Sequence, residues 1–105
     1  MNKQMRKMLQ QAQQMQAGLA KVQEELEEAR VEGSAGGGMV RAVVNGRAEM
    51  VGISIDPEAV DPEDVEMLED LVMAAVRDAS EKSRALSEQK MKELGMPTGG
   101  LGGMM

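Results

Sequence analysis

The sequence contains no cysteine, no histidine and no aromatic residue. Without cysteine the chain forms no disulfide and offers no thiolate to a metal ion. It also lacks the His, Cys and Tyr side chains that often act as nucleophile or proton shuttle in enzymes. Without aromatic rings it cannot recognise single-stranded nucleic acid by base stacking. We therefore expect a protein that is not an enzyme and that takes no cofactor, no metal ion and no small-molecule substrate.

Long apolar runs are missing as well. The first residues are too polar for a secretory signal, and no stretch approaches the ~20 apolar residues of a membrane span. We expect a soluble, cytoplasmic protein with no membrane partner. The 105 residues predict one domain whose core is built from Val, Leu, Ile, Ala and twelve Met. A chain this short buries only a modest core by itself, so we expect it to form a homodimer.

The net charge of −6 is distributed unevenly along the chain. Residues 1–23 hold four bases and no acid, whereas residues 56–76 hold eight acids and no base. The overall acidity argues against indiscriminate binding to nucleic acid, but a basic end on an acidic body is compatible with a localised contact. The acidic segment is best explained as the start of a helix, where the helix dipole favours negative charge, rather than as a metal site.

The clearest periodic pattern lies at the start of the chain. Between residues 1 and 29, apolar residues recur at alternating spacings of four and three. This pattern predicts one long helix with a heptad seam, ending near Arg30. The seam is rich in Met, and we favour helix-packing core over an adaptable binding groove as its role.

The only segment with strand character lies between this helix and a second helical pattern. We predict three antiparallel strands, at 31–35, 39–45 and 47–55, with the flexible Gly36-Gly37-Gly38 as the first turn. The glycine cluster is followed by a strand and not by a helix opening with Lys-Ser/Thr, so it does not indicate a phosphate-binding loop.

Asn45-Gly46 predicts a two-residue type I′ turn between the second and third strands. Val44 would then pair with Arg47, and Val40 with Val51. One face of the sheet would be apolar and ready to receive a helix; its residues are Val40, Ala42, Val44, Val51, Ile53 and Ile55. We expect the opposite face to be too apolar for plain solvent surface, which suggests a partner chain.

A second long helix is predicted over residues 62–94. Pro57 stops the third strand, Asp61 is the expected N-cap, and Pro62 suits the first helical position. The fold class is therefore α+β, with one α-β-β-β-α domain over residues 1–95. The Gly/Met-rich tail, 96–105, is expected to be disordered.

Several motifs in this order carry a family resemblance. They are VEGSAGGGMVRAVVNG, then VGISIDPE, then DPEDVEMLEDLVMAAVRDA, flanked by the Met/Gln/Lys heptad helix and the Gly/Met-rich tail. With these motifs the chain resembles the YbaB/EbfC family of bacterial nucleoid-associated proteins. The resemblance implies an intertwined homodimer with projecting helical arms. It also implies binding of double-stranded DNA with little sequence specificity, and roles in nucleoid organisation and gene regulation.

In this family the projecting helices are held responsible for DNA contact. The resemblance therefore implies a DNA-binding role for basic positions at the start of the first helix and in the last turns of the second. These positions are Lys3, Arg6, Lys7, Lys82, Arg84, Lys90 and Lys92, with Arg77 and Lys21 as weaker candidates. Contacts would be made to phosphates, because no helix-turn-helix or zinc finger is visible for base readout.

A second hypothesis belongs to another functional class. Heptad-bearing helices joined by β-hairpins also describe prefoldin-like coiled-coil chaperones or protein-interaction modules. In that case Met1, Met5 and Met8 would hold apolar segments of a client protein.

Overall fold

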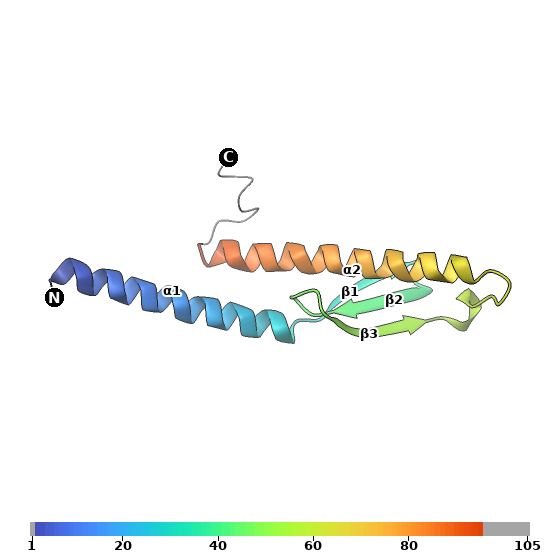
Figure 1. The fold of residues 1–105 in the computed structure, drawn as a ribbon, viewed down its shortest axis with the longest axis horizontal. Coiled ribbons are helices and arrows are strands. Elements are labelled where there is room, and N and C mark those ends of the chain that lie inside the picture. The colour runs from blue at the N-terminus through green and yellow to red at the C-terminus, as the bar shows by residue number, and fades with distance from the viewer. Residues whose placement is uncertain (1, 96–105) are drawn as a thin grey trace, which may run out of the picture.

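The computed structural model describes residues 2–95, and the predicted disorder of the tail concerns residues outside this range. The elements follow the predicted order of helix, three antiparallel strands and helix, so the α+β fold class is confirmed (Figure 1). A short 3-10 helix, which the sequence analysis did not predict, precedes the second long helix. The elements are α1 (Lys3–Glu28), β1 (Val31–Ala35), β2 (Val40–Val44), β3 (Met50–Ile55), η1 (Pro57–Ala59) and α2 (Val65–Glu93).

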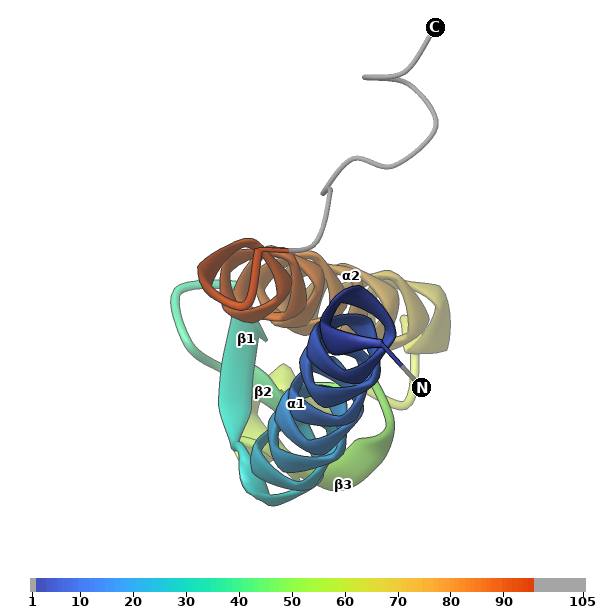
Figure 2. The same ribbon diagram turned by 90° about the vertical axis from the view of Figure 1, so that its left-hand side faces the viewer.

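The molecule has a small layered body and a long extension. Helix α2 lies along one side of the three-stranded sheet and packs on β1 and β2, while α1 leaves the sheet and runs beyond the end of α2 (Figures 1 and 2). The chain measures 73 × 31 × 16 Å, and its radius of gyration is 19.7 Å. A compact domain of this length would have a radius of gyration of about 13 Å. Much of the chain therefore lies outside any core of its own.

Close approach between α2 and the sheet depends on small residues. Ala75, Ala79 and Ser83 recur every fourth residue of α2, so they share one face, and all three are fully buried. Gly33 of β1 lies directly beneath them, and a Cβ atom there would collide with the backbone of Ala75 and Ala79. Ala42, the partner of Gly33 in the sheet, is also fully buried. The helix backbone therefore approaches β1 closely at these small residues.

The turn between β2 and β3 is longer than predicted. The prediction of a two-residue turn at Asn45-Gly46 is wrong, because residues 45–49 form a five-residue loop. Val40 consequently pairs with Ile55 and not with Val51, and a bulge interrupts the ladder near the loop. Both strands are therefore shorter than the sequence suggested.

Contacts with α1 explain this difference. The Gly46 N–H donates a hydrogen bond to the Leu26 carbonyl (2.7 Å), and a Cβ on Gly46 would meet the Leu26 backbone. The Asn45 side-chain oxygen accepts hydrogen bonds from two backbone N–H groups further along the loop. A type I′ turn requires positive φ at both central residues, but here Ala48 has positive φ (62°) and Gly46 does not. Gly46 therefore permits a close approach between chain segments and does not supply a left-handed turn.

Helix α2 also begins later than predicted. Asp64, and not Asp61, is its N-cap, since its Oδ1 accepts a hydrogen bond from Met67 N (3.2 Å). Asp61 instead accepts one from Glu63 N (2.9 Å) in the turn before the helix. Pro62 therefore lies outside α2, because a second aspartate three residues later forms the cap.

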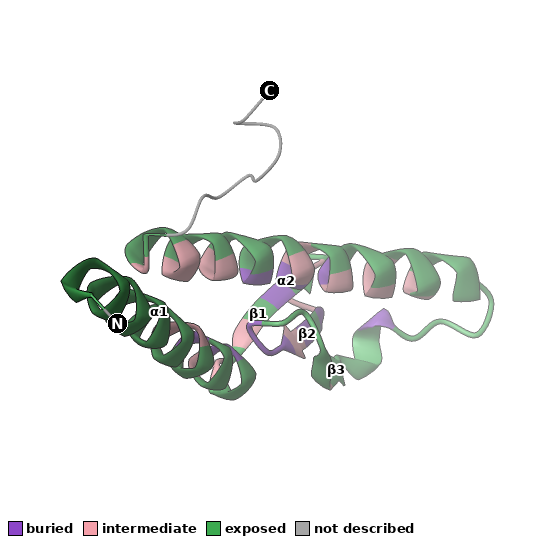
Figure 3. Cartoon of the chain, turned by 60° about the vertical axis from the view of Figure 1, so that its left-hand side comes forward, coloured by how far each residue is buried: buried purple, intermediate pink, exposed green. Residues whose placement is uncertain are grey.

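Part of the apolar face that was expected to receive a helix stays uncovered, on the side of the sheet where α2 packs. Ile53 pairs with buried Ala42 and Ile55 with buried Val40, so their side chains point toward the same face. Helix α2 does not extend over β3, which leaves Ile53 49% and Ile55 37% exposed (Figure 3).

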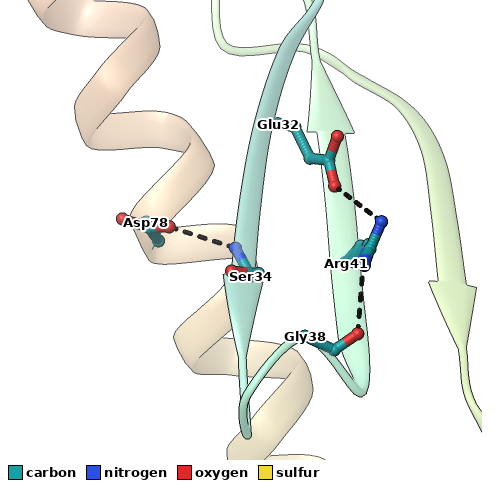
Figure 4. A network of polar contacts seen from close by, with 5 residues as sticks. All are labelled: Glu32, Ser34, Gly38, Arg41 and Asp78. Atoms are coloured by element: carbon teal, nitrogen blue, oxygen red, sulfur yellow. Dashed lines mark hydrogen bonds and ion pairs between the residues drawn. The ribbon is translucent and has the colours of Figure 1, made fainter.

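One of the two edge strands of the sheet, β1, is bonded by a side chain of α2. Ser34 of the edge strand β1 donates its backbone N–H to Asp78 of α2 (3.0 Å), as Figure 4 shows. On the neighbouring strand, Arg41 pairs with Glu32 (3.6 Å) and donates to the Gly38 carbonyl (3.3 Å). The Ser34 hydrogen bond lowers the pKa of Asp78, with a further contribution from Lys82. Occupied N–H groups and charges at an edge strand disfavour pairing with other chains.

Candidate nucleic-acid interface

The first half of α1 projects from the body as a separate arm. Gly18 lies against Leu94, at the end of α2, so the residues before Gly18 extend past the second helix (Figures 1 and 3). Lys3, Arg6 and Lys7 lie within the first turns of this arm and are exposed. About 15 residues at a rise of ~1.5 Å each make an arm roughly 22 Å long.

The tip of the arm concentrates positive charge. The Asn2 side chain caps α1 by accepting a hydrogen bond from Met5 N (2.8 Å), so the helix begins at Lys3. The first turn contains no acidic residue. The partial positive charge of a helix N-terminus adds to that of the basic side chains. An anion approaching this end meets favourable charge from both the backbone and the side chains.

Two of the predicted DNA-binding lysines are engaged in ion pairs within the chain. Lys82 contacts Asp78, which lies one turn earlier in α2 (3.0 Å), and Lys90 contacts Glu25 of α1 (2.8 Å). The hydrogen bond from Lys90 lowers the pKa of Glu25, and the same contact raises the pKa of Lys90. The Glu25–Lys90 pair joins the two helices near the base of the arm.

The other predicted residues of α2 are differently placed. Arg84 and Lys92 are exposed, and neither is paired with a carboxylate among residues 2–95. The weaker candidates Lys21 and Arg77 are exposed too. The basic positions thus form two groups, one at the tip of α1 and one along the second half of α2.

The sequence analysis did not single out Arg47 as a binding residue. Arg47 lies in the 45–49 loop and lines a pocket of about 400 Å³ together with Arg84. The remaining lining residues are Gly46, Ala48, Ser80, Ser83 and Ser87. No spacing in the sequence shows this juxtaposition, because it arises only when the loop packs between the two helices.

An apolar groove lies on the arm beside the basic tip. Met5 is 54% and Met8 67% exposed, and together with Leu9 and Ala12 they line it. In the single chain this half of the Met seam is exposed, so its expected role as helix-packing core stays a prediction. In the lower half of the seam, Val22 and Leu26 are buried as expected.

The described part of the chain contains neither a metal-binding cluster nor a membrane-spanning helix. No group of acidic side chains there is arranged to hold a metal ion. Neither described helix is long and apolar enough to cross a membrane.

The comparisons with known proteins agree with one another. The sequence profile of the YbaB/EbfC DNA-binding family matches residues 1–99. The chain belongs to the YbaB/EbfC DNA-binding family. Relatives in this family include a nucleoid-associated protein of Streptomyces avermitilis, 54% identical over 93% of this chain and 87% of that protein. Another, from Chloroflexus aurantiacus, is 52% identical over 94% of this chain and 96% of its own length.

The fold is also found in a solved structure. An uncharacterized protein from Helicobacter pylori has a TM-score of 0.65 and 25% identity, covering 90% of this chain and 94% of that one. The YbaB/EbfC description concerns DNA binding and names no reaction. The expected resemblance to this family is confirmed.

Proposed function

We propose that this protein is a nucleoid-associated protein that binds double-stranded DNA as a homodimer, with little sequence preference. It would reside in the nucleoid and contribute to nucleoid organisation and gene regulation. The observation that carries the proposal is the basic tip of α1, which projects from an acidic body in a member of a DNA-binding family. Because the arm lies away from the acidic body, its charges can meet phosphates while the net charge remains −6.

The expected contacts are made to the DNA backbone. Lys and Arg side chains at the arm tips neutralise phosphates and release counterions, which makes affinity fall steeply with salt. Neither a helix-turn-helix nor another base-reading element occurs among the described elements. Phosphate contacts position a protein on the duplex without reading its sequence, so little specificity follows.

The homodimer is supported by the apolar surface that the single chain leaves open. Ile53 and Ile55 continue the buried face of the sheet past the edge of α2. Val72, Met73 and Val76 of α2 line a second open hollow. The buried core consists of eight aliphatic residues, four of them alanine, so further burial would contribute strongly to stability. A second copy presenting the same surface would cover both regions.

The proposal is tested by measuring duplex binding at about 50 and 200 mM salt. The test variant carries Lys3→Gln and Lys7→Gln, which remove two charges from one side of the arm tip. The matched control carries Arg30→Gln and Arg41→Gln, which remove two charges near the sheet. Each lost phosphate contact should lower the slope of log K against log salt by about 0.9.

We expect the tip variant to lose most of its affinity and the control to bind like the parent protein. Equal losses in both variants would show that only the net charge matters. No binding by the parent protein at the lower salt would overturn the proposed function.

The apolar groove of the arm favours a second candidate, a coiled-coil chaperone or protein-interaction module. Exposed Met5 and Met8 at the tip of a projecting helix are suited to adaptable apolar contacts. Chaperone action would suppress the aggregation of an unfolded client and persist at moderate salt. Met5→Gln/Met8→Gln should abolish that suppression, whereas Lys3→Gln/Lys7→Gln should preserve it.

A further inference from the structure

The 45–49 loop lies in the angle between the two helices and is held by both. Gly46 N donates to the Leu26 carbonyl of α1 (2.7 Å). From α2, the Ser83 hydroxyl donates to the Asn45 carbonyl (2.8 Å) and accepts from Ala48 N (3.1 Å). A loop fixed from two sides presents its side chains in a defined place, which reduces the ordering cost of binding a ligand.

The pocket beside this loop is large enough for a hydrated anionic group. Its volume of about 400 Å³ corresponds to roughly a dozen water molecules. The loop contributes Arg47, and α2 contributes Arg84 together with Ser80 and Ser87 on the same helix face. Two arginines and two serines are thus neighbours around one open hollow.

The hydrogen-bond donors available to a ligand in this pocket are side chains. The loop N–H groups are already used: Arg47 N and Glu49 N donate to the Asn45 side chain, and Gly46 N and Ala48 N donate to the two helices. The acidic side chain of the loop, Glu49, is held by the Asn45 amide (2.7 Å).

Neither arginine of the pocket is used elsewhere in the described chain. Among residues 2–95, no carboxylate pairs with Arg47 or Arg84, in contrast to Lys82 and Lys90. A guanidinium presents planar, paired donors that match two phosphate oxygens at once. Two such groups at one pocket are suited to a single phosphodiester.

We propose that Arg47 and Arg84 form a phosphate-binding pocket at the base of the arm and that it holds a phosphate of the DNA backbone. This inference rests on the proposed function and adds a second contact to it. From Lys3 to Leu26, α1 rises by about 35 Å, which is close to one helical turn of B-DNA, ~34–36 Å. The arm tip and the pocket are thus spaced to contact phosphates about one turn apart.

The test compares Arg47→Gln/Arg84→Gln with the charge-matched control Arg30→Gln/Arg41→Gln in the full chain. Arg30 donates only to backbone carbonyls beside it, and Arg41 pairs with Glu32 across the sheet. With a 24-base-pair duplex, the pocket variant should bind about tenfold more weakly than the control. Its salt slope should be smaller by about 0.9 for each pocket engaged. Equal affinity and slope in the two variants would overturn the proposal.

Inorganic phosphate separates the possible sources of the bound group. The arginine Nε–H signals of Arg47 and Arg84 are followed by NMR while phosphate replaces chloride at constant ionic strength. Shifts in these signals together with weakened DNA binding support the proposal. Shifts without any effect on DNA affinity would identify a site for small phosphate compounds and overturn the DNA assignment.

A parent protein that does not bind duplex DNA would refute the proposed function. The phosphate titration would then test only whether the pocket binds phosphate. Shifts confined to Arg47 and Arg84 would retain the phosphate site without DNA, and unchanged signals would overturn it.

Discussion

Gly33 determines how closely α2 approaches the sheet. The helix backbone at Ala75 and Ala79 occupies the space that a side chain on Gly33 would need. The sequence does not show that a glycine on β1 lies opposite these alanines. The pairing of small residues across two elements is a tertiary feature that no local pattern records.

Gly33→Ala is expected to destabilise the protein by about 3 kcal/mol, because the added Cβ forces α2 away from the sheet. Urea unfolding followed by circular dichroism measures the change. Gly52→Ala is the control, since a Cβ there makes an ordinary contact with Val43 at 3.9 Å. An equal loss of stability from both substitutions would show that the close approach of α2 to Gly33 is not its cause.

Ser83 is a buried polar residue whose role was not predicted. A serine within a helical pattern is expected to be exposed. Ser83 is instead buried, and its two backbone partners come from the 45–49 loop that packs against it. Its hydroxyl adds a second hydrogen bond to both the Asn45 carbonyl and the Ala48 N–H, which also bond each other (3.1 Å).

Ser83→Ala should lower the free energy of unfolding by about 1 kcal/mol, because it removes both Ser83 hydrogen bonds and leaves the Asn45 carbonyl and the Ala48 N–H only the bond between them (3.1 Å). Ser87→Ala, one turn further along α2, should change it by less than about 0.5 kcal/mol. Amide hydrogen exchange would show faster exchange at Ala48 in the first variant only. Unchanged protection at Ala48 would contradict this account.

At the scale of elements, periodicity was sufficient to predict both helices and all three strands. The heptad spacing and the glycine-bounded strands are local signals, and local signals decide element type. The β2–β3 turn was mispredicted because Gly46 responds to α1, which is distant in the sequence. Likewise, sequence could nominate Lys82 and Lys90 as DNA-binding residues but could not show their carboxylate partners.

The Glu25–Lys90 ion pair links α1 to α2, and its contribution to stability depends on pH. The pair lowers the Glu25 pKa from its ordinary 4.5, so its contribution is present above pH 4.5 and is lost as pH falls through the lowered value. It raises the Lys90 pKa from 10.5, so the contribution is present below pH 10.5 and is lost as pH rises through the raised value.

Glu25→Gln should therefore destabilise the protein at pH 7 and have little effect at pH 3. Urea unfolding at both pH values, with Glu24→Gln as an exposed control, measures the difference. A destabilisation that is the same at pH 3 and pH 7 would show that the ion pair is not its source.

At the scale of the whole molecule, the apolar residues are divided between a thin core and an open surface. Ile53 illustrates this division, because its side chain lies on the same face of the sheet as buried Ala42 and yet is half exposed. A homodimer was expected from composition, but the sequence could not show that α2 leaves β3 uncovered and so opens part of the apolar face on which the helix packs.

Ile53→Lys should convert a dimer into monomers, because a charge would be buried at the centre of the interface. Sedimentation equilibrium at micromolar concentration measures the mass. Met8→Lys adds the same charge on the arm and should leave the dimer intact. A parent protein that sediments as a monomer would rule out the proposed assembly.

The hydrogen bond from Gly46 to Leu26 fixes the end of α1 that lies farthest from the arm tip, so it has a mechanical consequence. Helix α1 rises about 35 Å from Leu26 to Lys3, and a tilt of about 10° at Leu26 moves the tip by about 6 Å. The Glu25–Lys90 ion pair holds α1 against α2 next to Leu26. Small adjustments at these two contacts therefore set the span between arm tips while the sheet stays unchanged.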